Sequence, residues 1–224
     1  MSSKGTQSYV LRYFDAVGYG EPIRLLLTSA NVEWSEVHPE WPQEKPNQPF
    51  GRLPVLVEKS ADGSPDFIIS EPGNIERYIA RKYGLIPADL REAALQEQMR
   101  DQLSDAHTSL LRCFFAIGKE DKKTRMTAFL VVFDDVIAIQ SKLLRENGNR
   151  GRLFGSRISY ADIVSYGFYK DLLIGMGKHD ENIVDIVKSK LTPEISCLIY
   201  TVETDSRLER YILKTGSLLA IINS

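Results

Sequence analysis

The sequence predicts an α+β protein in which a small domain of strands and helices precedes a larger, all-helical domain. Up to about residue 84, short strand-like runs alternate with helical segments, and a hairpin signal follows them. From about residue 88 to residue 213, apolar side chains recur at the helical period and no convincing strand run appears. We therefore divide the chain into a first domain (1–84), a linker (85–91) and a helical domain (92–224).

The first domain begins with a strand at 9–14, which is rich in aromatic and branched side chains. Glu21-Pro22 then opens a helix, because proline is well tolerated in a first turn, and Asn31 ends it. A second strand is predicted at 32–37. Strand, helix and strand in this order imply a parallel crossover.

Two further strands, 55–58 and 67–69, flank Asp62-Gly63, a pair typical of hairpin turns. A helix follows at 74–83. Because a hairpin adds antiparallel strands, the first domain is expected to hold a mixed, four-stranded sheet.

Pro54 lies directly before the strand at 55–58, where a proline removes no sheet hydrogen bond. An X-Pro bond reaches the cis form far more readily than other peptide bonds. A cis Leu53-Pro54 bond would turn the Leu53 backbone outward and leave it free to pair with an extended peptide ligand. From spacing alone, a strand that simply begins after a turn is the alternative.

The helical domain is expected to start with two long helices, and its later helices are shorter. Ser159-Tyr160-Ala161-Asp162 matches the capping pattern of a helix start. The apolar tail 218–222 must pack somewhere, either over a pocket or on the helical domain, and the sequence leaves both open. The predicted helices cover 88–117, 122–146, 160–174, 182–190, 193–204 and 206–213.

Composition indicates an ordinary globular protein, with 43% hydrophobic residues, 26% charged residues and a formal net charge of −2. There is no basic surplus to suggest nucleic acid, and the apolar runs are too short to span a membrane. The polar N-terminus lacks the apolar core of a signal peptide, so we expect a cytoplasmic protein. Two cysteines and three histidines fit no metal spacing, so no metal is expected.

Four segments carry a further signal: Tyr9–Phe14 with Glu21–Arg24, Trp41-Pro42 with Pro49–Pro54, Ile75–Ile79, and Leu153–Gly155 with Ser159–Asp162. In this order they resemble the cytosolic glutathione transferases of the tyrosine-type classes (sigma, alpha and pi). The resemblance implies a thioredoxin-like first domain, a cis Leu53-Pro54 bond, glutathione as co-substrate and a homodimer. It also implies an enzyme that conjugates the glutathione thiolate to hydrophobic electrophiles.

The resemblance places the catalytic hydroxyl on Tyr13. In these enzymes a tyrosine donates a hydrogen bond to the glutathione sulfur, which favours the thiolate, the nucleophilic form, over the thiol. The alternative is that Tyr13 is a core aromatic of the first strand.

The resemblance also implies a glutathione site and a neighbouring apolar pocket. The alternative for Lys45 and Arg52 is that they are solvated loop charges, and His107 is interpreted as a surface or packing histidine rather than a base. The expected glutathione-binding residues are Trp41, Lys45, Arg52, Leu53, Pro54, Glu71, Pro72 and, from the partner subunit, Asp101, with Asp105 as the second candidate for that acid. The expected pocket residues are Phe14, Tyr19, His107, Leu111, Val164 and Phe168.

Two residues depart from the family pattern. Pro72 stands where the family has a serine that offers a hydroxyl and an N–H to the γ-glutamyl carboxylate, and Tyr19 stands where an arginine usually supports the thiolate. Losing these donors predicts weaker glutathione binding. The alternative function is therefore a protein of this fold with lost or weakened glutathione use, acting as an apolar-ligand binder or as an isomerase or cyclase of a hydrophobic metabolite.

Overall fold

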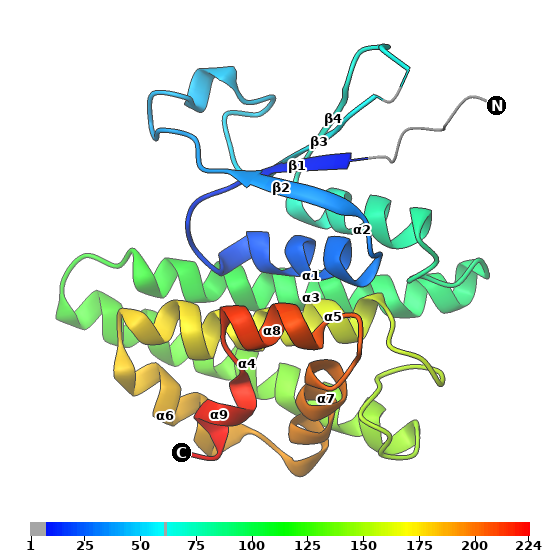
Figure 1. Ribbon diagram of the computed structural model, residues 1–224. Coiled ribbons are helices and arrows are strands. Elements are labelled where there is room, and N and C mark those ends of the chain that lie inside the picture. The colour runs from blue at the N-terminus through cyan, green and yellow to red at the C-terminus, as the bar shows by residue number, and fades with distance from the viewer. Residues whose placement is uncertain (1–7, 61) are drawn as a thin grey trace.

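The computed structural model describes residues 8–60 and 62–224, so residues 1–7 of the first predicted domain lie outside it. The sheet and two helices lie at one end of the molecule, and the remaining helices pack against them (Figure 1). This arrangement confirms the predicted α+β fold. The predicted domain division falls between α2 (Pro72–Lys82) and α3 (Leu90–Phe114), and it stays a prediction.

Within the described residues, four strands form one mixed sheet in the order β2-β1-β3-β4. β1 runs parallel to β2 and antiparallel to β3, and β3 runs antiparallel to β4. β3 is buried along its whole length. The bounds are β1 (Ser8–Arg12), β2 (Glu33–Val37), β3 (Val55–Glu58) and β4 (Phe67–Ser70).

The first helix, α1 (Glu21–Ser29), starts at Glu21 with Pro22 in its first turn, as predicted. It packs between the sheet and α5 (Tyr160–Lys170) (Figure 1). The contact requires a glycine at position 167, because a Cβ there would lie 2.9 Å from Pro22 Cγ. The first part of the chain is thereby held against the helical part.

The helical part differs from the sequence prediction mainly after α5. The predicted helix over 160–174 stops at Lys170 and continues as a π-helical turn, η3 (Asp171–Gly175). Apolar periodicity does not separate α from π turns over so short a stretch, and π turns occur frequently at functional sites. The other helices are α4 (Lys119–Glu146), α6 (Glu181–Lys190), α7 (Pro193–Glu203), α8 (Glu209–Thr215) and α9 (Leu218–Ile222).

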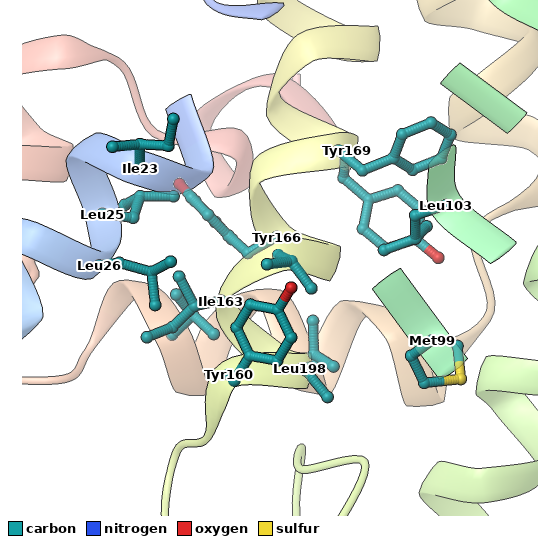
Figure 2. Close-up of a cluster of buried hydrophobic side chains, with 14 of the residues drawn as sticks. Ile23, Leu25, Leu26, Met99, Leu103, Tyr160, Ile163, Tyr166, Tyr169 and Leu198 are labelled. Atoms are coloured by element: carbon teal, nitrogen blue, oxygen red, sulfur yellow. The ribbon is translucent and has the colours of Figure 1, made fainter. Parts of the chain in front are cut away.

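The main core lies where α1, α3, α5 and α7 meet (Figure 2). Leu26 of α1 and Leu198 of α7 are fully buried, as are Tyr160 and Ile163 of α5. Because every residue of α5 is buried, it is the central helix of the fold. No helix in the described ranges is long and apolar enough to cross a bilayer.

The apolar tail forms α9, which docks on the helical part and contacts α7 and η3. Leu218 is fully buried, and its N–H donates to the carboxylate of Glu203, as does the Ser217 hydroxyl. Of the two placements that the sequence left open, the structure shows docking on the helical domain.

The cap of α5 stabilises the fold. Asp162 accepts hydrogen bonds from the backbone N–H groups of Leu153 (2.7 Å) and Ser159 (2.9 Å). Burial raises the pKa of Asp162 to about 6, although these hydrogen bonds oppose the shift. We expect Asp162→Ala to lower the free energy of unfolding by about 2–3 kcal/mol, since it leaves buried N–H groups unpaired.

Urea unfolding followed by circular dichroism checks this prediction. Glu181→Ala removes an exposed acidic residue from the first turn of α6 and should cost no more than about 0.5 kcal/mol. Equal losses in the two variants would contradict a specific role for the cap.

Candidate functional site

Two cavities meet at the boundary between the sheet end and the helical part, and Tyr19 borders both. The first, here called the Pro54 cavity, has a volume of about 200 Å³. The second, the Tyr13 cavity, has a volume of about 410 Å³. The Pro54 cavity is lined by Tyr19, Phe50, Arg52, Leu53, Pro54, Ser70, Glu71, Pro72 and Ser104.

The floor of the Pro54 cavity is the loop that leads into β3. The Leu53-Pro54 bond is cis, as predicted, and a second cis bond, Trp41-Pro42, was not predicted. Among the described residues, the backbone N–H and C=O of Leu53 make no hydrogen bond. Leu53 therefore offers a free donor and acceptor at the cavity wall, which is the arrangement that an extended peptide needs for strand-like pairing.

The opposite wall is the junction of β4 with α2. Glu71 has φ 69°, a left-handed conformation that non-glycine residues seldom adopt outside functional sites. Pro72 follows as the first residue of α2 and has no N–H to offer. The Ser70 hydroxyl is buried and has no hydrogen-bond partner among the described residues. This wall thus lacks a backbone hydrogen-bond donor at Pro72. Two residues earlier, the Ser70 hydroxyl is a donor without a partner among the described residues.

Tyr13 lies just past the end of β1, where the chain leaves the sheet, and its side chain lines the Tyr13 cavity. The N–H of Tyr19 donates to the Tyr13 hydroxyl at 2.9 Å. Gly18 and Gly20 make room for the ring, because a Cβ at either position would lie 2.4 Å from a Tyr13 atom. The phenol is therefore held in place by the loop that follows it.

The protonation state of Tyr13 follows from its surroundings. The side chain is only 6% exposed, and this burial raises the pKa of Tyr13 above its ordinary value. The hydrogen bond from the Tyr19 N–H offsets only part of that rise. The hydroxyl consequently keeps its proton at neutral pH and, with its oxygen already accepting from Tyr19, can donate into the cavity.

The structure gathers most, but not all, of the predicted glutathione-binding residues. Arg52, Leu53, Pro54, Glu71 and Pro72 line the Pro54 cavity. Three others do not line it. Trp41 packs edge-on against Phe14, with ring centres 5.4 Å apart, the Lys45 side chain runs beside Gly51, and Asp101 of this chain is ion-paired with Arg77 on the outside of α3.

The predicted apolar pocket is divided into two spaces. Phe14, Tyr19, His107 and Leu111 line the Tyr13 cavity. Val164 and Phe168 instead line a separate small space of about 20 Å³ that Tyr19 and His107 also border. His107 is 6% exposed, so it is not a surface histidine.

Sequence reasoning misses several residues of the Tyr13 cavity because they follow α3 and α5 in the chain. The aromatic side chains at 114–115 and Ile117 after them are exposed apolar residues, a pattern that the prediction did not include. Asp171 gave no sequence signal, because it lies inside the helix predicted over 160–174. The missed residues include Phe114, Phe115, Asp171, Met176, Lys178 and His179.

Known families and structures resemble this chain along most of its length. Residues 9–81 match the model for the glutathione S-transferase N-terminal domain, and residues 104–215 match that for the glutathione S-transferase C-terminal domain. The chain is 34% identical over 166 residues to glutathione S-transferase 4 of Caenorhabditis elegans, with 70% of this chain and 76% of that protein covered.

Solved structures are also similar to this chain in fold. A glutathione S-transferase from Caenorhabditis elegans superposes with a TM-score of 0.74 at 31% identity, over 94% of this chain and 99% of that one. The structure named prostaglandin synthase D of Nilaparvata lugens gives a TM-score of 0.76 at 24% identity, over 93% of this chain and 98% of that one. At that identity the likeness concerns the fold alone.

Proposed function

Because this chain belongs to the glutathione S-transferase family, we propose that it conjugates the glutathione thiolate to hydrophobic electrophiles, with Tyr13 activating the thiol. The observation that carries the proposal is the Tyr13 hydroxyl, which is fixed by the Tyr19 N–H and protonated at neutral pH. It lines the Tyr13 cavity, which meets the Pro54 cavity at Tyr19 and Leu53.

The chemistry needs a donor that prefers the sulfur anion. Lowering a thiol pKa by about two units takes roughly 2.7 kcal/mol of preference for the thiolate. One charge-assisted hydrogen bond supplies about 1.5–3 kcal/mol. The hydrogen bond from Tyr13 is therefore sufficient to lower the thiol pKa by this amount, without the arginine that the family has at the position of Tyr19.

Glutathione is proposed to lie extended in the Pro54 cavity. The backbone of Leu53 pairs with the cysteinyl unit, and Arg52 takes the glycine carboxylate, with Trp41 and Lys45 completing that end through small movements of their loop. The γ-glutamyl carboxylate lies at the start of α2, where the helix dipole and the N–H of Gly73 favour an anion. The unpartnered Ser70 hydroxyl supports the same placement.

This chain brings one acid, Glu71, to its own Pro54 cavity, and the family places a second acid at the tripeptide amine. We propose that it comes from Asp101 of the partner subunit in a homodimer. The outward position of Asp101, whose side chain is 69% exposed, supports this role. A sedimentation mass equal to one chain would contradict it. A cytoplasmic location is proposed from the family, and cell fractionation tests it.

Calorimetric titration with glutathione tests the central proposal. We expect a dissociation constant between low micromolar and low millimolar values, and turnover of chlorodinitrobenzene, a generic aryl halide. If the chain instead binds apolar ligands without using glutathione, no heat will appear at glutathione concentrations of about 10 mM. That result would overturn the proposal.

A further inference from the structure

A buried acid–histidine pair lies in the wall of the Tyr13 cavity. His107 Nε2 and Asp171 Oδ2 are 2.9 Å apart, and their side chains are 8% and 1% exposed. Neither atom has a hydrogen-bond partner among the described residues, and the contact becomes an ion pair when the imidazole is protonated.

Asp171 is fixed independently of the histidine. Its other oxygen, Oδ1, accepts the N–H of Gly18 at 2.8 Å. It begins the π-helical turn η3, and a Cβ at Gly175 of the same turn would lie 2.2 Å from Oδ1. Its carboxylate is thus tied to the loop that also positions Tyr13, and it is available as the counter-charge of an imidazolium.

The other ring nitrogen of His107 is free to act. Nδ1 makes no hydrogen bond to the residues that the structure describes, and it is not fully enclosed by protein atoms. The ring stacks on Tyr19 with centres 4.1 Å apart, which fixes its orientation. His107 and Tyr13 line the same cavity, so a proton donor and the proposed thiol activator share one space.

We propose that His107 is a proton donor for conjugation to α,β-unsaturated carbonyl compounds, with Asp171 as its positioning residue; this inference rests on the proposed function. The thiolate forms a C–S bond at the β-carbon, and the electrons of the C=C bond move to give an enolate. Nδ1–H of the imidazolium then protonates the enolate. Neutral His107 takes a proton back from water, which replaces the proton lost when the thiol ionised.

Loss of the proton donor should affect two substrate classes differently. An aryl halide accepts the thiolate and expels chloride, so no proton has to be delivered. An alkenal such as nonenal cannot complete the reaction without one. A histidine that only packs against Tyr19 would affect both reactions alike.

The experiment measures kcat and KM of the full chain with nonenal and with chlorodinitrobenzene. We expect His107→Gln to lower kcat for nonenal on the order of a hundredfold, with KM and the aryl halide rate changed by no more than about threefold. Asp171→Asn keeps an acceptor for the Gly18 N–H. It should also lower kcat for nonenal more than the aryl halide rate, but by a smaller factor than His107→Gln. It serves as the second variant if His107→Gln does not fold.

His179→Gln is the matched control, because His179 is an exposed histidine that lines the same cavity and packs against Phe114. It should change both rates by the same factor. Equal losses for both substrates in His107→Gln and Asp171→Asn would overturn the inference while leaving the proposed function intact. If the unmodified chain turns over neither substrate, the proposed function fails instead.

Discussion

Tyr13→Phe is expected to lower the rate of aryl halide conjugation at pH 7 by about 10- to 100-fold. This range corresponds to the loss of one charge-assisted hydrogen bond worth about 1.5–3 kcal/mol. The hydroxyl favours the thiolate, so its removal returns the pKa of bound glutathione toward the ordinary thiol value of about 8.5. The deficit should therefore shrink as the pH rises through that value, because the thiol then ionises without help.

A pH–rate profile with saturating glutathione checks this expectation. Tyr9→Phe is the matched control, because Tyr9 lies on β1, just before Tyr13, but its hydroxyl contacts that of Tyr83 at 2.6 Å, away from both cavities. It should lower stability and leave the profile unchanged. A Tyr13→Phe rate equal to that of the unmodified chain at pH 7 would rule out thiol activation by this residue.

Pro72→Ser is expected to tighten glutathione binding by about 10- to 100-fold. The serine would add a backbone N–H and a hydroxyl at the start of α2, where the γ-glutamyl carboxylate is proposed to lie. Each hydrogen bond to a charged group contributes about 1.5–3 kcal/mol. The range of about 10- to 100-fold corresponds to one such hydrogen bond, because the Ser70 hydroxyl is taken to make the other contact already. The loss of a proline suited to the first turn should cost no more than about 1 kcal/mol of stability.

Calorimetry on both proteins measures the change in dissociation constant. Pro65→Ser, in the hairpin loop and absent from the lining of the Pro54 cavity, makes the same chemical change elsewhere and should leave the affinity as it is. If Pro72→Ser binds glutathione no more tightly than the unmodified chain, the carboxylate does not lie at the start of α2.

The order of the elements was readable because each carries a local signal. Glu21-Pro22 marks the start of α1, and the Asp62-Gly63 pair marks the hairpin between β3 and β4. The capping pattern at Ser159–Asp162 marks α5. Each depends on residues within a few positions of one another, so short-range backbone preferences are enough to reveal them.

The lining of the Pro54 cavity was also largely predictable, because most of it comes from two short segments, 50–54 and 70–72. The lining of the Tyr13 cavity was not. His107 lies 2.9 Å from Asp171, which is distant in sequence and belongs to a π turn that helical periodicity does not distinguish. His107 was consequently interpreted as a packing residue, although the pairing gives it a free nitrogen beside a buried counter-charge.

The sequence by itself determined the α+β fold, the family, the position of Tyr13 and the two departures at Tyr19 and Pro72. Only the tertiary structure decided where the α9 tail docks, that the Tyr19 N–H holds the Tyr13 hydroxyl, and that Asp171 faces His107. The physical reason is the range of the interactions. Turns, caps and periodicity are properties of neighbouring residues, whereas a buried ion pair or a shared cavity exists only once distant helices have packed together.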